Sequence, residues 1–173
     1  MFSERPITNK QIILVGVDHV FQWNDELPKA DELTEYLIKI TNKIPIDLIG
    51  EEFSIDAFPV NIKTTVPQKI AIKHNINHRF CDPDEQIRDK IGYPTQVQMR
   101  NKFGIKSAHE GTEEHRVRRE YEKGFWHIRE KYWLDQINDG ISKNIIFICG
   151  YSHLKSFESL LKEKGYIVTA KII

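Results

Sequence analysis

Two apolar segments of the sequence end in the same four-residue pattern, G-x-x-H. Residues 11–15 lead into Gly16-Val17-Asp18-His19, and residues 144–149 lead into Gly150-Tyr151-Ser152-His153. Short β-branched runs are typical of buried strands, and a glycine after a strand permits a sharp turn. Open α/β sheets bind ligands beyond the carboxyl ends of their strands. The sequence therefore predicts that both histidines lie at one edge of such a sheet.

The rest of the chain alternates between segments typical of strands and segments typical of helices. This alternation favours one α/β domain over residues 1–173, with a mainly parallel sheet, helices on both faces and a site at the C-terminal edge of the strands. Residues 93–111 contain no clear element, and we expect them to cover the mouth of the site. Strands are predicted at residues 11–15, 46–49, 78–81, 144–149 and, at a sheet edge, 166–172; helices are predicted at residues 26–42, 65–74, 85–91 and 112–138 and around Phe157.

The composition narrows the possible partners. Lysine plus arginine and aspartate plus glutamate each number 25, so no net charge draws the chain to nucleic acid. No apolar run approaches the ~18 residues of a membrane span, and the first ten residues lack the apolar region of a signal peptide. Cys81 and Cys149 are expected to be buried thiols. These features favour a cytoplasmic protein without nucleic-acid or membrane partners, and they leave the oligomeric state open.

Residues that bind metals or transfer protons follow each of the first four predicted strands. They are His19, Glu51 with Glu52, Asp82 and His153. Two imidazoles with two or three carboxylates are suitable ligands for Zn²⁺, Mn²⁺ or Fe²⁺. Alternation along the strand would turn only one of the two glutamates toward the site and leave the other solvated. Asp82 has a simpler alternative role, which is to cap the helix that follows it.

Arg129 lies in a predicted helix beside apolar residues such as Trp126 and Trp133. A guanidinium that is buried there needs a carboxylate partner or an anionic ligand. The alternative is a surface arginine whose stem alone is buried. The basic residues of 115–119 alternate with glutamates and indicate a solvated face, and His78 is set aside because it falls at a helix–strand boundary.

The two G-x-x-H turns, Glu51-Glu52 and Arg129 occur in an order that resembles the TraB/PrgY/Tiki superfamily, which includes erythromycin esterases and ChaN-type haem-binding proteins. The resemblance implies a divalent-metal-dependent hydrolase, peptidase-like or esterase-like, that acts on a small molecule or a peptide. Its metal (Mn²⁺, Zn²⁺ or Fe²⁺) would be held by His19, Glu51 or Glu52, and His153. One glutamate would take a proton from metal-bound water, and Arg129, with Asp82, would contact the substrate.

Some relatives in that superfamily bind haem or signal, so the same resemblance leaves open a non-enzymatic ligand-binding module. A nucleotide-binding fold is a weaker alternative, because the chain has no G-x-G-x-x-G or Walker lysine motif.

Overall fold

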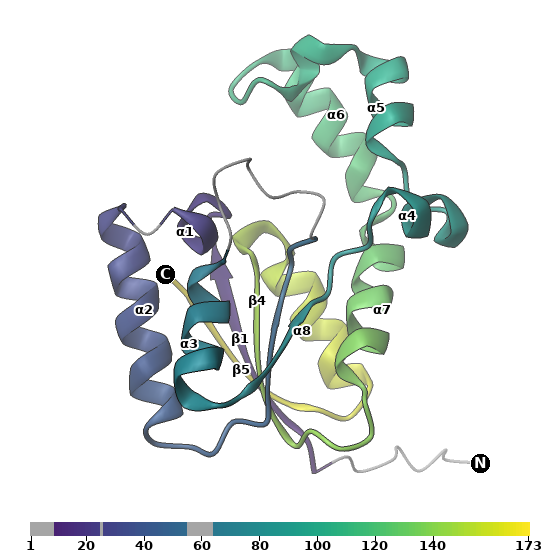
Figure 1. The fold of residues 1–173 in the computed structure, drawn as a ribbon. Helices are drawn as coiled ribbons and strands as arrows, with labels where there is room; N and C mark the ends of the chain where they lie inside the picture. Colours follow the sequence, from purple (N-terminus) through teal and green to yellow (C-terminus); the bar gives the residue numbers. More distant parts are fainter. Residues whose placement is uncertain (1–8, 25, 55–63) are drawn as a thin grey trace, which may run out of the picture.

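The computed structural model describes residues 9–24, 26–54 and 64–173, and its centre is a five-stranded parallel sheet (Figure 1). The strand order is β3-β2-β4-β1-β5, and every pair of neighbouring strands is parallel. The predicted mainly parallel α/β sheet is thus confirmed, with the last strand at an edge. The strands are β1 (Gln11–Val17), β2 (Leu48–Glu51), β3 (Asn77–Phe80), β4 (Asn144–Gly150) and β5 (Ile167–Ile172).

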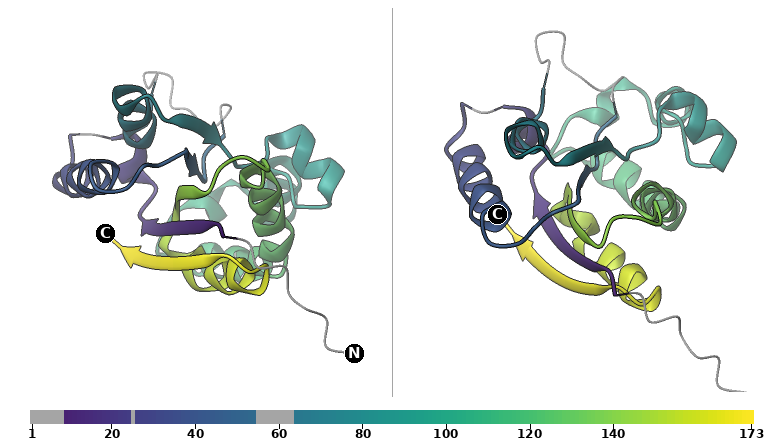
Figure 2. Two further views of the ribbon diagram at one scale, coloured as in Figure 1. Left: turned by 90° about the horizontal axis from the view of Figure 1, so that it is seen from below. Right: turned by 60° about the horizontal axis from the view of Figure 1, so that its bottom comes forward.

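Helices cover both faces of this sheet, as Figures 1 and 2 show from three directions. On one face lie α2 and α3, and on the other lie α7 and α8. Among the described residues, no helix has both the length and the apolar character that are needed to cross a membrane. The helices are α1 (Val20–Trp23), α2 (Pro28–Thr41), α3 (Val66–His74), α4 (Glu85–Ile91), α5 (Gln96–Phe103), η2 (Ile105–Ala108), α6 (Glu113–Lys123), α7 (Trp126–Ile137), η3 (Tyr151–His153) and α8 (Leu154–Glu163).

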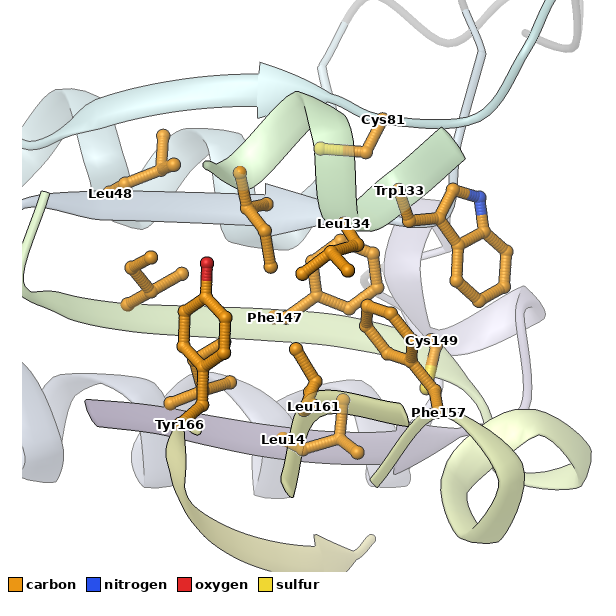
Figure 3. Close-up of a cluster of buried hydrophobic side chains, with 13 residues drawn as sticks. Leu14, Leu48, Cys81, Trp133, Leu134, Phe147, Cys149, Phe157, Leu161 and Tyr166 are labelled. Carbon is orange, nitrogen blue, oxygen red and sulfur yellow. The ribbon is translucent and has the colours of Figure 1, made fainter. Parts of the chain in front are cut away.

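The core consists of two apolar layers because side chains alternate between the two faces of each strand. In β4, Ile146 and Ile148 pack toward α2 and α3, whereas Phe147 packs toward α7 and α8. Figure 3 shows the second layer, in which Trp133 and Phe157 meet the ring of Phe147. The two cysteines also lie in this layer as buried free thiols, as expected.

Gly50 marks the point where β2 passes closest to this second layer. A Cβ atom at residue 50 would lie 2.9 Å from Phe147 Cδ2 and 3.2 Å from Cys81 Sγ. Such contacts are shorter than ordinary van der Waals distances, so the packed ring of Phe147 requires a glycine beside it.

The expectation that residues 93–111 contain no element is wrong, and the helix expected over residues 112–138 is divided at Gly124, the residue at which the sequence allows a bend. Residues 93–111 are not irregular, because they include α5 and η2, and Thr95 begins α5 with a capping box that Gln98 completes. The long helix is broken at Gly124, where the amides of Gly124 and Phe125 bond to carbonyls three residues back instead of four. The break turns α6 away from α7, and α6 then pairs with α5 beyond the C-terminal edge of the sheet (Figure 1).

Candidate active site

Glu52 is the centre of a charged cluster at the C-terminal edge of the sheet. It follows β2 directly and is buried, and its Oε1 lies 3.4 Å from His19 Nε2 and 3.8 Å from His153 Nε2. The expectation that the two imidazoles lie within ~10 Å of each other is confirmed, since both face one oxygen atom. The strand order explains this meeting, because β4 lies between β1 and β2 and their ends share one edge.

Arg129 joins Glu52 to Asp82. Its Nη1 lies 2.7 Å from Glu52 Oε1 and its Nε donates to Asp82 Oδ1 at 2.6 Å. Only 13% of its side chain is exposed, so the alternative of a surface arginine is wrong. Burial alone would lower the pKa of Arg129, but the two carboxylates hold it well above its usual value. Burial alone would likewise raise the pKa of Glu52, but Arg129 and the charged ring of His19 hold it well below its usual value.

Asp82 serves this cluster and does not cap the helix after it. Its Oδ1 also accepts from the indole nitrogen of Trp133, and its Oδ2 accepts from Arg88 Nη2 at 3.0 Å. The cap of α4 is Asp84, whose Oδ1 accepts from the amide of Ile87. Asp82 is therefore a carboxylate that holds two arginines in place.

His19 is the member of the cluster that reaches solvent, with 46% of its side chain exposed. Its Nδ1 lies 2.8 Å from Gln22 Oε1, and Gln22 Nε2 donates to Glu51 Oε2 at 3.0 Å. A carboxylate only accepts, so Gln22 must turn its NH₂ to Glu51 and its oxygen to His19. Nδ1 of His19 is therefore a donor, and a second proton on Nε2 faces Glu52. Burial lowers the pKa of His19, but Glu52 and Gln22 outweigh this and raise it from 6.5 to about 9.

We expect an NMR titration of the His19 ring to show a midpoint well above 6.5, near 9. Because folding favours the protonated ring, its contribution to stability is complete below pH 6.5 and is lost as the pH rises through about 9. In Glu52→Gln the midpoint should fall toward 6.5, because the coulombic and hydrogen-bond contributions of Glu52 are removed. An unchanged His19 midpoint in Glu52→Gln would contradict the pairing.

Glu51 belongs to a second hydrogen-bond network, on the face of β2 opposite to the one toward which Glu52 turns. His78 Nε2 lies 2.7 Å from Glu51 Oε1, the Thr65 hydroxyl donates to the same oxygen, and Gln22 bonds to the other. The expectation that one glutamate is solvated is wrong, because helices cover both faces and bury both carboxylates. Three residues of this network were not expected at the site, namely Gln22, Thr65 and His78. Strand alternation could have indicated His78, since it pairs with Ile49, two residues before Glu51 and on the same face.

His153 is buried behind Glu52 and is held on both sides. Its Nδ1 lies 2.9 Å from Glu130 Oε1, and its ring packs between Trp126 and Trp133. Arg129 Nη1 lies 3.5 Å from Nε2. A guanidinium can only donate, so Nε2 accepts and the ring proton lies on Nδ1, toward Glu130. Glu130 was not expected here, and it also accepts from Ser156 Oγ.

The side chains around Glu52 offer atoms that can bind a metal ion, but their positions do not suit a metal site. Two imidazole nitrogens and a carboxylate oxygen suit Zn²⁺, Mn²⁺ or Fe²⁺. However, the guanidinium of Arg129 already lies against Glu52 Oε1 and His153 Nε2, where a cation would sit. In the described part of the chain, no three His, Cys, Asp or Glu residues are placed to hold an ion. Glu51 is turned to the other face, so metal dependence stays a prediction from the sequence.

The two G-x-x-H turns pack against each other through their glycines. A Cβ atom at Gly150 would lie 2.7 Å from His19 Nε2, and one at Gly16 would lie 3.2 Å from Tyr151 Cα. Gly150 has φ −57° and ψ 135°, a conformation open to other residues. Its expected role in permitting a sharp turn is therefore wrong: it makes room for His19, while its amide donates to Glu52 Oε2.

An open cavity of about 270 Å³ lies above Glu52, between the sheet edge and the α5–α6 pair, and a second of about 300 Å³ adjoins it at His19. From the segment 93–111, which was expected to cover the mouth of the site, Gln96 lines the first cavity and Glu110 lines the second. The lining residues of the first cavity are His19, Glu52, Arg88, Gln96, His115, Arg118, Arg119, Glu122 and Arg129.

The fold and this cluster define a parallel α/β protein with a histidine–glutamate–arginine site at the sheet edge. Comparison of the chain with protein-family models, with curated proteins and with solved structures finds no match. The likeness to the TraB/PrgY/Tiki superfamily therefore rests on the motifs alone.

Proposed function

We propose that the protein is a hydrolase, esterase-like or peptidase-like, whose reacting groups are His19 and Glu52. The observation that carries the proposal is a solvent-accessible imidazole that faces a buried, ionised carboxylate at the floor of a cavity. A strongly shifted pKa in such a place is typical of acid–base sites.

In the proposed reaction, His19 donates its Nε2 proton to the leaving group as water attacks the carbonyl carbon. The neutral ring then takes the proton that the attacking water loses, which restores the imidazolium. Glu52 stabilises the charged ring before the first of these steps and after the second, and Gln22 fixes its orientation through Nδ1. Arg129 lines the same cavity and can stabilise negative charge on the carbonyl oxygen. No step requires a metal.

The test is an assay of the purified, chelator-treated protein against chromogenic esters and aminoacyl amides. Hydrolysis by the wild type that is lost in Glu52→Gln supports the proposal, because glutamine keeps the shape of the side chain and removes its charge. His127→Gln, a change to an exposed histidine outside the cavity, is the matched control.

Two further measurements distinguish this proposal from the alternatives that the sequence left open, which are a metal-dependent hydrolase and a non-enzymatic binding module. Activity that appears only after Mn²⁺, Zn²⁺ or Fe²⁺ is added would mean that Arg129 gives way to a metal. A protein that turns over none of the substrates but binds haem, seen as a Soret band, would favour the non-enzymatic binding module.

A further inference from the structure

Four arginines line the cavity above Glu52, in a chain whose overall charge is zero. Arg88 and Arg129 come from α4 and α7, and Arg118 and Arg119 come from α6. The basic residues of 115–119 were expected to lie on a solvated face. Arg118 and Arg119 are instead partly buried and line the cavity.

The charges of two of these arginines are already matched. Arg129 pairs with Glu52 and Asp82, and Arg88 pairs with Asp82. Both side chains are mostly buried, at 13% and 10% exposure. They form the floor of the cavity.

Arg118 and Arg119 differ from them, because each donates a hydrogen bond to a neutral side chain of the described residues. Arg118 Nη2 donates to Gln96 Oε1 at 2.8 Å, and Arg119 Nη2 donates to Ser152 Oγ at 3.1 Å. No carboxylate in the described ranges forms an ion pair with either of them. The other carboxylate of the lining, Glu122, accepts from the hydroxyl of Tyr93.

Arg116, on the same helix, shows the ordinary surface arrangement. It is 67% exposed, lies outside the cavity and forms a two-bonded ion pair with Glu113. Among the described residues, the arginine and lysine side chains of α6 that have no ion-pair partner are thus the two arginines that line the cavity. Arg118 lies beside α5 and Arg119 lies beside η3.

We propose that this cavity binds a phosphate group of the substrate between Arg118 and Arg119. The proposal rests on the proposed function in one respect, because it takes the phosphate to be part of the molecule whose bond His19 cleaves. Two guanidiniums without carboxylate partners match a dianion, and their planar N–H groups suit paired hydrogen bonds to phosphate oxygens. The phosphate would replace the neutral acceptors Gln96 and Ser152.

The test is a calorimetric titration of the full chain with inorganic phosphate at neutral pH and low salt. We expect millimolar or tighter binding by the wild type, and a loss of at least about tenfold in Arg118→Gln and in Arg119→Gln separately. Arg116→Gln should bind as the wild type does. Trp126 gives a second readout, because its ring lies 5.7 Å from the Arg119 guanidinium and its fluorescence should respond to phosphate.

Absence of phosphate binding by the wild type would overturn the proposal, as would equal losses in Arg116→Gln and the two cavity variants. A dicarboxylate such as succinate that binds as tightly, with the same dependence on Arg118 and Arg119, would overturn the phosphate assignment. Phosphate binding needs no turnover, so its failure is separate from failure of the hydrolase. Conversely, phosphate binding without hydrolysis of any ester would leave the anion site standing and remove the catalytic role.

Discussion

Replacing Arg129 with methionine is expected to lower the free energy of unfolding by about 3–5 kcal/mol. Methionine fills much of the same volume but leaves the buried carboxylates of Glu52 and Asp82 without their shared cation. A loss of that size changes the folding equilibrium by a factor of hundreds to thousands. Urea denaturation at neutral pH measures it, provided that the slope of the transition is unchanged.

The matched control is Arg116→Met, which breaks an exposed ion pair on α6 and should cost less than about 1 kcal/mol. The double variant Glu52→Gln/Arg129→Met should recover part of the loss, since it removes one of the unpaired charges. Equal stability losses in Arg129→Met and Arg116→Met would show that the cluster around Glu52 does not depend on the guanidinium.

His19→Gln is expected to reduce hydrolysis about 10²- to 10⁴-fold while the protein still folds. His19 is half exposed and packs little, so its loss removes the proton donor and not the core. The ratio kcat/KM on any substrate found in the assay is the measurement, and His127→Gln should leave it unchanged.

Gly150→Ala tests whether His19 acts from its position beside Glu52, and it leaves every reactive group unchanged. The added methyl would lie 2.7 Å from His19 Nε2, so the imidazole must swing away from Glu52. A displacement of about 1 Å can cost ~100-fold in rate. The same variant should bring the pKa of His19 back toward 6.5. Full activity in Gly150→Ala would mean that His19 does not act from this position.

Patterns along the chain were enough to predict the sheet, because β1, β2 and β4 are short, mainly apolar runs that alternate with segments typical of helices. They were also enough to bring His19, Glu52, Arg129 and His153 together, since residues that follow parallel strands share an edge. The partners Gln22, Thr65, Glu130 and Ser156 could not be predicted in this way. They are polar residues within or beside helices, and only the packing of those helices turns them toward the carboxylates and His153.

The errors have a common physical origin. The expectation that one glutamate is solvated considered β2 alone, although helices cover both faces of the sheet, and the capping alternative for Asp82 considered only the helix next to it. Likewise, the apolar stripe of residues 112–138 continues through Gly124, but the backbone bends there so that α6 can pack on α5. Contacts between elements therefore determine the surroundings of Glu51 and Asp82 and the direction of α6.

The segment Leu48-Ile49-Gly50-Glu51-Glu52 has a consequence for how β2 finds its place during folding. A strand that slips by one residue turns every side chain to the other face. Here such a slip would keep one aliphatic and one acidic position of the segment filled by a residue of the same kind, so these pairs distinguish the correct register only in part. Gly50 distinguishes it in both directions, because after a slip Ile49 or Glu51 would meet the ring of Phe147, where even a Cβ atom would lie 2.9 Å from Phe147 Cδ2. The residue without a side chain is what selects the register that sends each glutamate to its own network.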